Sequence, residues 1–478
     1  MPSTDAVASD ARLHPLKVDD LRRALERRLG DGRVLTDQDR MEDYCRDWSG
    51  ADPAYPDLVV EAASADEVEA VLSIAQDHRC PVTPRGMGSG KAGGSVPVHG
   101  GLVLGLRDMR GVEEVHTGDL VAVARAGTPL QSVHEAATSE GLFYPPDPGS
   151  AHLCSIGGNV ACNAGGPRAL KYGTTKHYVL GLEVVTPATG RIRLGARSVK
   201  QATGFDLTAL VVGSEGLLGI ITEVTLRLLP QPRSVCTAMV GFPSVGAASV
   251  AVTRAFTQGL HPRCLELLDP FATRVLAEQA PGVVPDGADA VLIVETDGTE
   301  TGATEEMARL AECFESAGAG AVSVAQHEGQ REQIWAPRRM LSEALRRTAH
   351  RKRSEDVTVP RSQIPSFLDR LQRVAEETQV RVAAYGHAGD GNLHVNVLFD
   401  PDQVQEADRV LESVAKICIE MGGTLSGEHG LGRLKRNLLP LEQSSKVIRL
   451  QQALKAQFDP AGILNPGKVF PSGFGGWE

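Results

Sequence analysis

The stretch PRGMGSGKAGG, residues Pro84 to Gly94, decides how the first half of this chain folds. It contains G-S-G-K-A-G, which matches the G-x-G-x-x-G dinucleotide fingerprint, and Asp108 follows about twenty residues later, where a ribose-binding acid is expected. The fingerprint requires a strand before the glycines and a helix after them. The segment CPVTP, residues 80–84, predicts the strand, and SADEVEAVLSIAQDH before it predicts a helix.

The residues after the glycines do not predict a helix. The chain continues as GSVPVHGGLVLGL, in which Pro97 and two adjacent glycines are costly inside a helix. A P-loop does not fit either, because Arg85 stands where its first glycine belongs and Lys91 is followed by alanine. The stretch therefore predicts a turn whose backbone N–H groups point into one concavity suited to a diphosphate. A glycine-rich hairpin connection without a ligand is the alternative.

Composition limits the class of protein. A chain of 478 residues with 42% hydrophobic residues is long enough for two to four domains. The net charge of −11 argues against nucleic acid and anionic membranes as main partners, and no run of eighteen apolar residues predicts a transmembrane segment. The beginning of the sequence has no apolar core typical of a secretory signal, and it carries several acids that a transit peptide lacks.

The eight cysteines are scattered and include no C-x-x-C pair, which disfavours a zinc ribbon or an iron–sulfur cluster. In a chain of this length they indicate buried thiols in a reducing compartment. We therefore expect a cytoplasmic protein, with a peripheral position at the inner membrane as the variant left open.

The order of patterns predicts an α+β protein in four parts. Residues 1–53 are a helical lead-in, residues 54–232 alternate strands, glycine turns and short helices, and LLPQPR marks the end of that part. Residues 233–400 predict an antiparallel sheet domain of split-βαβ type, in which VRVAAYGH and NLHVNVLF pair across the turn AGDG. Residues 401–478 are mainly helical.

Two further glycine-rich regions follow the first. One is PPDPGSAHLCSIGGNVACNAGGPRALKYGTT, residues 145–175, and the other is TGFDLTALVVGSEGLLGIITEVTLRL. So many glycine, proline and asparagine residues indicate backbone lying close to a large flat ligand. Three such loops in one domain are difficult to explain as turns alone.

Polar residues gather in the second half of the chain. His387 and His394 flank the turn AGDGN, Asn396 shares a strand face with His394, and SGEHGLG supplies Glu428 and His429. Two imidazoles and a distant carboxylate can form a divalent-metal site. Taken singly, each histidine is more often structural, so the hypothesis depends on the whole group.

At this point the motifs carry a family resemblance. The three glycine-rich stretches resemble the FAD-binding domain of the vanillyl-alcohol-oxidase/p-cresol-methylhydroxylase superfamily. With HAGDGNLH, SGEHGLG and DPAGILNPGK added, the chain resembles the glycolate oxidase subunit/D-lactate dehydrogenase branch over about residues 40–471. The resemblance implies a two-subdomain PCMH-type FAD-binding domain, a substrate domain, and a C-terminal segment that completes the active site.

The resemblance also implies which residues contact FAD. The first loop would wrap the diphosphate, and the other two would lie along the isoalloxazine, ribityl and adenosine portions. The residues assigned in this way are Arg85, Gly86, Met87, Gly88, Ser89, Gly90, Gly93, Gly94, Ser95, Pro146, Asp147, Ser150, Gly157, Gly158, Asn159, Gly165, Gly166, Glu215, Gly219 and Ile221. We expect non-covalent FAD, because the first loop has no histidine or cysteine, and His152 and Cys154 do not match the attachment positions of relatives that bind flavin covalently.

In the 2-hydroxyacid dehydrogenases that the chain resembles, the positions of His387, His394 and Glu428 bind a divalent metal, with zinc as the first expectation. The position of His429 is the base that takes the hydroxyl proton while the Cα hydride passes to flavin N5. Arg338 in IWAPRRML matches an arginine that clamps the substrate carboxylate, and Asn396 completes the expected catalytic set. A surface arginine on an exposed helix is the alternative for Arg338.

The substrate expected is a small D-2-hydroxy acid, glycolate or D-lactate. D-2-hydroxyglutarate is the alternative, but relatives that use it carry a lysine where this chain has Ser354, with Arg353 beside it. A zinc hydrolase with a nucleotide-binding domain would leave three glycine loops unexplained, and the intact histidine group argues against a non-catalytic flavoprotein subunit. The electron acceptor would be a quinone, a carrier protein or an iron–sulfur partner subunit, with poor reactivity toward oxygen. A homodimer is left open.

Overall fold

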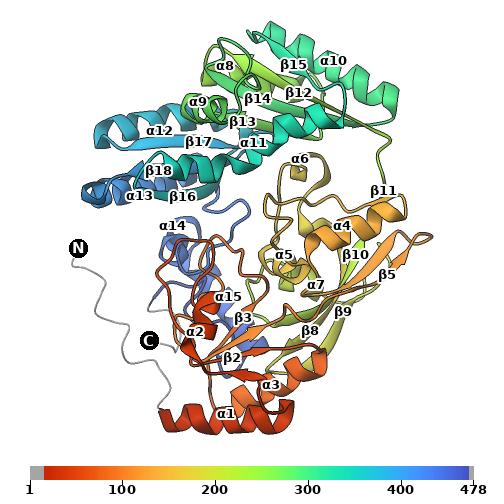
Figure 1. The fold of residues 1–478 in the computed structure, drawn as a ribbon, viewed down its shortest axis with the longest axis vertical. Helices are drawn as coiled ribbons and strands as arrows, with labels where there is room; N and C mark the ends of the chain where they lie inside the picture. The colour runs from red at the N-terminus through yellow and green to blue at the C-terminus, as the bar shows by residue number, and fades with distance from the viewer. Residues whose placement is uncertain (1–14, 473–478) are drawn as a thin grey trace.

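The computed structural model describes residues 15–472, which form two lobes (Figure 1). The first lobe holds a four-stranded and a five-stranded sheet, and the second lobe is built on one seven-stranded sheet. In Figure 1 the first lobe lies below and the second above, and the blue C-terminal segment runs from the upper lobe into the lower one. The α+β class predicted from the sequence is confirmed.

The four-stranded sheet positions the first glycine loop. Its strands are β1 (Val34–Leu35), β2 (Leu58–Glu61), β4 (Leu102–Gly105) and β3 (Val82–Arg85), in the order β1-β2-β4-β3, with β4 parallel to both β2 and β3. Helix α1 (Pro15–Leu29) packs against β1 and against α3 (Ala65–Asp77), and α3 also packs against the five-stranded sheet. Helix α3 begins where the Ser64 side chain accepts from the backbone N–H of Glu67, as an N-cap residue does.

The predicted absence of a helix after the glycines is confirmed. Strand β3 ends at Arg85, and residues 86–101 run as turns and bends until β4 begins at Leu102. Gly88 has φ +72° and Gly93 has φ +78°, in the left-handed region that favours glycine. The fingerprint match at this loop is therefore formal, because no dinucleotide-type helix follows it.

The five-stranded sheet carries the other two glycine regions. Its strands run in the order β5-β6-β10-β8-β9, and every neighbouring pair is antiparallel. The elements are β5 (Val112–His116), β6 (Val121–Arg125), β8 (Val179–Thr186), β9 (Gly190–Gly195), β10 (Ile220–Arg227), α4 (Leu130–Ser139), α5 (Ile156–Cys162), α6 (Ala169–Tyr172) and α7 (Leu207–Val211), with β7 (Leu142–Phe143) paired to β11 (Leu229–Pro230). One hydrophobic core joins both sheets of this lobe.

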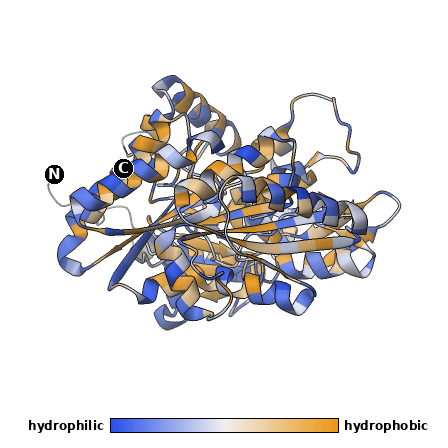
Figure 2. Ribbon diagram, turned by 90° about the horizontal axis from the view of Figure 1, so that it is seen from above, coloured by the Kyte–Doolittle hydropathy of each residue, from blue (hydrophilic) through white to orange (hydrophobic). Residues whose placement is uncertain are grey.

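The second lobe is an antiparallel sheet covered by helices on both faces. The strand order is β15-β12-β14-β13-β17-β18-β16, and Figure 2 shows apolar strands between layers of helices with hydrophilic outer surfaces. The strands are β12 (Ser234–Phe242), β13 (Cys264–Leu268), β14 (Ala290–Gly298), β15 (Val322–Val324), β16 (Arg351–Thr358), β17 (Arg381–His387) and β18 (Asn392–Phe399). The helices are α8 (Val245–Thr257), α9 (Pro270–Gln279), α10 (Glu300–Ser316), α11 (Glu328–Arg347), α12 (Ile364–Thr378) and α13 (Val404–Glu420).

The two faces of this sheet differ in what they carry. Helices α8, α10, α12 and α13 contribute to one hydrophobic core, and α9 and α11 contribute to the other. Because side chains alternate along a strand, Val395 and Val397 of β18 enter the first core while Leu398 enters the second. His394 and Asn396 share the parity of Leu398, so the polar residues lie on the α9–α11 face.

The edge strand β16 was not among the predicted elements. Its sequence, RKRSEDVT, has more charged than apolar residues and lacks a strand-like alternation. The strand forms because it pairs along its whole length with β18, from Arg351 opposite Phe399 to Thr358 opposite Asn392. A long-range pairing of this kind overrides a weak local preference.

The C-terminal segment ties the two lobes together. After α14 (Leu439–Glu442) and α15 (Ser445–Phe458), the chain returns to the first lobe, where the backbone N–H of Val82 donates to the carbonyl of Ile463 at 2.8 Å. Leu464 forms a parallel bridge with Val82, and the side chains of Ile463 and Leu464 are fully buried in the core of the first lobe. The four domain boundaries proposed from the sequence stay a prediction. No helix within residues 15–472 is long and apolar enough to span a bilayer.

We expect Leu464→Ala to destabilise the protein by about 2–5 kcal/mol, because it removes a buried side chain and leaves a cavity in the first core. Leu450→Ala on α15 is the matched control, since that leucine is 63% exposed and its loss should change stability by less than about 0.5 kcal/mol. Chemical denaturation of both variants measures the difference. Equal stabilities would show that the C-terminal return does not contribute to the core.

Candidate active site

The hairpin of β17 and β18 positions the two histidines predicted as metal ligands. His387 is the last residue of β17, and His394 pairs with Tyr385 in the antiparallel register. Both rings stand on the same side of the hairpin, with centroids 5.2 Å apart and planes at 86°. His387 is 6% exposed and the side chain of His394 is 13% exposed, so the hairpin presents two largely buried imidazoles.

Glu428 and His429 reach this pair on the loop of residues 426–432. The Oε1 atom of Glu428 lies 3.8 Å from Nε2 of His387, 3.6 Å from Nε2 of His394 and 3.5 Å from Nε2 of His429. The rings of His394 and His429 are stacked with centroids 5.3 Å apart. The structure therefore brings together the four residues that the sequence grouped from positions far apart in the chain.

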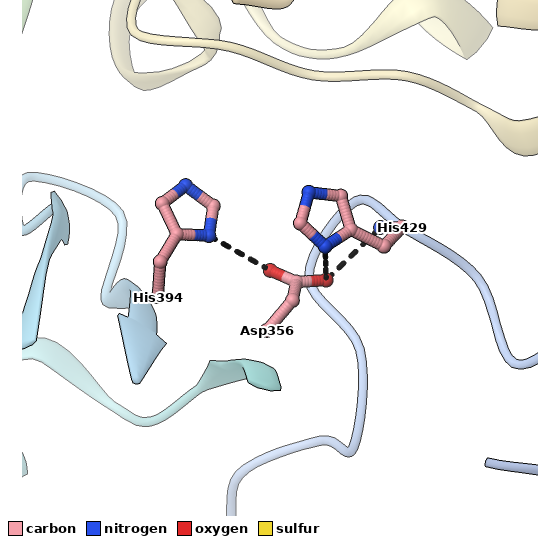
Figure 3. Close-up of side chains that lie close together, drawn as sticks. All are labelled: Asp356, His394 and His429. Atoms are coloured by element: carbon pink, nitrogen blue, oxygen red, sulfur yellow. Dashed lines mark hydrogen bonds and ion pairs between the residues drawn. The ribbon is translucent and has the colours of Figure 1, made fainter. Parts of the chain in front are cut away.

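A buried aspartate on β16 holds this loop against the sheet (Figure 3). Oδ2 of Asp356 accepts from the backbone N–H groups of Glu428 and His429 and from the Ser426 hydroxyl, each at 2.9 Å. Its Oδ1 accepts from Nδ2 of Asn392 at 2.6 Å. Figure 3 shows the carboxylate between the rings of His394 and His429, whose Nδ1 atoms lie 3.8 and 3.9 Å away. Asp356 thus fixes the loop by hydrogen bonds and lies beside two imidazoles, of which the Nδ1 atom of His394 is buried without a hydrogen-bond partner.

A second buried carboxylate lies behind His387. Glu266 on β13 is fully buried, and its Oε1 accepts from Nδ1 of His387 while Oε2 accepts from the guanidinium of Arg338. Arg338 comes from α11, and its guanidinium lies 4.6 Å above the ring of Tyr385. The arginine is therefore not a surface residue, since its side chain is only 11% exposed.

The electrostatics of the group differ between the two hairpin histidines. Burial lowers the pKa of His387, but the charge of Glu266 and its hydrogen bond raise that pKa well above its ordinary value. Burial, together with the neighbouring His387 and His429, lowers the pKa of His394 to about 3, so this ring is neutral near pH 7. Burial alone would raise the pKa of Glu428, but the neighbouring imidazoles of His387 and His429, with the charge of His387, lower it well below its ordinary value. The pKa of Glu266 falls to about 2 because His387 and Arg338 outweigh its burial.

Two triads within residues 15–472 have ligand atoms close enough to share one cation. One is His387, His394 and Glu428, and the other is Asp356, His394 and His429, each with atoms within 4.8 Å of one another. Asp356 already accepts four hydrogen bonds, whereas Oε2 of Glu428 is buried without a hydrogen-bond partner. Two imidazole Nε2 nitrogens and a carboxylate with an unpaired oxygen are a donor set that suits zinc. The first triad is therefore the better fit for a divalent metal.

The first glycine loop is supported by the buried side chain of Arg85. A Cβ on Gly88 would overlap the guanidinium of Arg85, which lies under the loop and donates to the backbone carbonyls of Asp43 and Arg46 at 2.7 and 2.9 Å. The side chain of Arg85 thus packs against Gly88 and ties the turn to the backbone of residues 43 and 46. This leaves the backbone of residues 86–95 as the surface that a ligand can approach.

The second glycine region faces the first. A Cβ on Gly86 would lie 2.6 Å from Oγ of Ser155, the residue that precedes α5. The hydroxyl of Ser155 and Nδ2 of Asn159 are both buried without a hydrogen-bond partner. Buried polar atoms in proteins are nearly always paired, so two orphans beside two glycine loops fit a polar cofactor that completes them. The residues present therefore fit the FAD expected here.

Glu215 contacts protein backbone, which the sequence did not indicate. Its two carboxylate oxygens accept from the backbone N–H groups of Leu431 and Gly432 at 2.8 Å each. Asn465 donates to the carbonyl oxygens of Glu215 at 2.8 Å and Gly94 at 3.0 Å. The third glycine region, the first loop and the loop of His429 are thus joined directly.

The two lobes meet at the histidine group. A Cβ on Gly165 would lie 3.2 Å from Oε2 of Glu428, and a Cβ on Gly389, in the AGDG turn, would overlap the side chain of Leu170. Small residues at these two positions allow the close approach. The flavin loops therefore end where the proposed metal ligands begin.

The other predicted residues are placed less directly. Asn396 lies two residues beyond His394, and its Oδ1 accepts from Ser354 at 2.7 Å and from Lys352 at 3.1 Å. Asp147 pairs with Arg168 at 2.9 Å. The remaining members of the FAD set lie in the loops and at the element ends already described: Met87, Ser89, Gly90, Gly93 and Ser95 in the first loop, Pro146, Ser150, Gly157, Gly158 and Gly166 in the second region, and Gly219 and Ile221 at the start of β10.

Two residues central to the site were missed. Neither Asp356 nor Glu266 is among the residues that the sequence patterns single out. The available signal was the same in both cases: a carboxylate inside a short strand-like segment, in CLELLD and in EDVTVP. Such a residue needs a buried partner, because an unpaired charge in a core is costly.

Comparisons with known proteins agree with this geometry. A model of "FAD linked oxidases, C-terminal domain" matches residues 231–469, and one of "FAD binding domain" matches residues 56–195. The fold resembles that of p-cresol methylhydroxylase with TM-score 0.81 at 15% identity, covering 97% of this chain and 99% of that one. Fold and site thus define an FAD-linked oxidoreductase of PCMH type.

Relatives by sequence indicate the family within this class of oxidoreductases. The chain is 38% identical to glycolate oxidase subunit GlcD of Bacillus subtilis, over 88% of this chain and 91% of that protein. It is 34% identical to D-lactate dehydrogenase of Anaerostipes hadrus, with 91% and 94% covered, and 35% identical to D-2-hydroxyglutarate dehydrogenase of Xanthomonas citri pv. viticola, with 92% and 94% covered. The chain belongs to the FAD-linked oxidase family that contains these enzymes.

Gly88→Val should abolish FAD binding, because the branched side chain would displace Arg85 and strain a backbone with φ +72°. Gly141→Val is the control: Gly141 has φ +70°, but an added Cβ there meets no other atom within 4 Å. The flavin absorbance per protein after gel filtration measures the effect. A folded Gly88→Val protein with a full complement of FAD would rule out the proposed role of the loop.

Proposed function

We propose that this protein is an FAD-dependent dehydrogenase that oxidises a small D-2-hydroxy acid, glycolate or D-lactate, to the 2-oxo acid. The observation that carries the proposal is the convergence of two imidazoles, a carboxylate, a candidate base and a buried arginine where the flavin loops meet the second lobe. The relatives named glycolate oxidase subunit and D-lactate dehydrogenase support this substrate class.

Arg338 is the residue suited to bind the substrate carboxylate. Its guanidinium is planar, and contacts with Glu266 and Tyr385 fix the orientation of that plane. Its Nε atom is buried without a hydrogen-bond partner. A planar cation with an unused donor in a largely buried position favours a bidentate anion such as a carboxylate.

His429 is the residue suited to take the hydroxyl proton. It is the most exposed of the three histidines, at 23% of its side chain, so it can meet a substrate. Asp356 lies 3.9 Å from its Nδ1 and anchors its backbone, which orients Nε2 and stabilises the imidazolium formed after proton transfer. His387, His394 and Glu428 would hold a divalent metal, zinc first, which when bound lowers the pKa of a ligated hydroxyl. FAD, when bound, accepts the hydride from Cα.

A dicarboxylate is the second candidate substrate. Although Ser354 stands where relatives that use D-2-hydroxyglutarate carry lysine, Lys352 lies two residues earlier on β16 and therefore on the same face. Its Nζ is 2.7 Å from Oγ of Ser342 on α11 and 3.1 Å from Oδ1 of Asn396. Burial and the charge of Lys91 lower the pKa of Lys352 to about 8, so it is mainly protonated at pH 7. Such a cation could meet a second carboxylate.

The proposal extends to flavin attachment, the electron acceptor and the location in the cell. FAD is held without a covalent bond, and electrons leave to a quinone, a carrier protein or an iron–sulfur partner subunit in preference to oxygen. All eight cysteines are free thiols in the structure, which supports the cytoplasm or the inner face of a membrane as the location. A dye-linked assay with glycolate, which has no stereocentre, and with paired D- and L-2-hydroxy acids of increasing length tests the substrate. Activity on L-isomers alone, or on none of the acids, would refute the proposal.

His394→Ala and His429→Ala should separate the metal from the base. His394→Ala removes a ligand, so metal content and activity should fall together. His429→Ala should keep its metal and lose flavin reduction by about 10²–10⁴-fold, the range for a positioned acid–base group. Elemental analysis and anaerobic stopped-flow reduction measure both quantities, and dithionite reduction of the flavin checks the redox centre. A native rate of flavin reduction in His429→Ala would show that His429 is not the base.

Arg338→Ala should strongly lower kcat/KM while the flavin spectrum stays native, because the substrate loses its carboxylate anchor. Arg339→Ala is the matched control, since the neighbouring arginine is 42% exposed and pairs with Glu332 on the surface of the same helix. Steady-state measurement of kcat/KM in the two variants and the wild type tests the prediction. Similar losses in both would indicate a general effect of α11 charge.

A further inference from the structure

We infer that Glu266 is a positioning residue that orients the metal ligand His387 and the substrate-binding Arg338 together. The inference rests on the proposed function, since it assigns no separate activity. It concerns a residue on β13, a strand that contributes neither a proposed metal ligand nor a proposed base.

The carboxylate of Glu266 is shared by two partners, His387 and Arg338. Glu266 is 0% exposed and uses its oxygens separately, with Oε1 toward Nδ1 of His387 and Oε2 toward the guanidinium of Arg338. These partners arrive from β17 and from α11, so Glu266 fixes the distance between a strand and a helix. Burial of a carboxylate is costly, and two cationic or donating partners offset the cost.

The contact with His387 determines which nitrogen is free. A carboxylate can only accept, so Nδ1 of His387 must carry the proton that it shares with Glu266. In the neutral ring the lone pair then belongs to Nε2, the atom that faces Glu428 at 3.8 Å. A carboxylate behind a ligating histidine sets ring direction, tautomer and basicity in this way.

The contact with Arg338 determines where its guanidinium lies. Glu266 holds one terminal nitrogen, and the ring of Tyr385, whose centroid is 4.6 Å from the guanidinium carbon, holds the plane. In the proposed function, Arg338 binds the substrate carboxylate and the metal held by His387 binds the substrate hydroxyl. Glu266 contacts both Arg338 and His387. Glu266 therefore sets the spacing between the two ends of a 2-hydroxy acid.

Glutamine at this position would conflict with both partners at once. The amide has one acceptor, which Arg338 requires, so its NH₂ group would face Nδ1 of His387. That ring would then have to protonate Nε2 and lose the lone pair needed for a metal. Glu266→Gln keeps the size of the side chain, so its effect reports the acceptor pattern and the charge more than the packing.

The chain offers a matched control in Glu295. This residue lies on the adjacent strand β14, is 1% exposed, and pairs with Arg331, another arginine of α11. It also accepts from Trp335 at 2.7 Å and contacts no histidine of the site. Glu295→Gln therefore removes a comparable buried charge without touching the proposed ligands.

The test uses purified FAD-loaded protein from which metal has been removed, titrated with Zn²⁺ in competition with a chromophoric chelator. We expect Glu266→Gln to bind zinc 10–100-fold more weakly than the wild type, the usual effect of losing a partner of a metal-bound histidine, and to show a raised KM. Glu295→Gln should bind zinc like the wild type, even if its melting temperature falls. Both variants should keep a native flavin spectrum and reduction by dithionite.

Glu266→Asp guards against a Glu266→Gln protein that fails to fold. It keeps both acceptors but withdraws them by one methylene, so zinc affinity and KM should worsen to a smaller extent. Wild-type zinc affinity and KM in either Glu266 variant would overturn the inference, as would equal losses in Glu295→Gln. Absence of zinc binding by the wild type itself would instead overturn the metal site of the proposed function, and the inference with it.

Discussion

The active-site arrangement depends on the burial of the Asp356 carboxylate. A buried charge of this kind is tolerated only when donors surround it, and Asp356 has four: Nδ2 of Asn392, the Ser426 hydroxyl, and the backbone N–H groups of Glu428 and His429. Three of the four belong to the loop that carries Glu428 and His429. The same interaction that satisfies the aspartate therefore places the candidate ligand and the candidate base against the hairpin histidines. Loss of any one donor would affect the loop and the carboxylate together.

The loop is also held from the opposite lobe. Glu215 accepts hydrogen bonds from the backbone N–H groups of Leu431 and Gly432, which follow the two residues bound by Asp356 after one intervening glycine. A loop without regular secondary structure is thus fixed between two carboxylates, one from each lobe. This explains how a loop can hold its side chains with the precision that an active site requires. It also explains the glycines at 430 and 432, where φ is +78° and +48° and where a Cβ would overlap Glu215 and the backbone of Ala92 respectively.

Local patterns predicted most of the fold, and the site only in part. The absence of a helix after Gly93 followed from proline and glycine preferences, which act within a few residues. The hairpin of His387 and His394 was predictable because alternation and a glycine turn lie within one short segment. Asp356 and Glu266 were not, because their partners lie far along the chain: Glu428 is 72 residues beyond Asp356, and His387 is 121 residues beyond Glu266. A carboxylate inside a strand signals that a partner exists without identifying it.

The return of the C-terminal segment to the first lobe has a consequence for biosynthesis. Ile463 and Leu464 complete a core whose other members lie mostly before residue 230, and Asn465 joins Gly94 to Glu215. During translation the ribosome delivers these residues only after the entire second lobe has been made. The core of the first lobe therefore lacks Ile463 and Leu464 while more than two hundred residues are added after residue 230. The first and third glycine-rich regions are joined by Asn465 only after residues 463–465 have been made, so a chain interrupted before this point would expose a hydrophobic surface to the quality-control machinery of the cell.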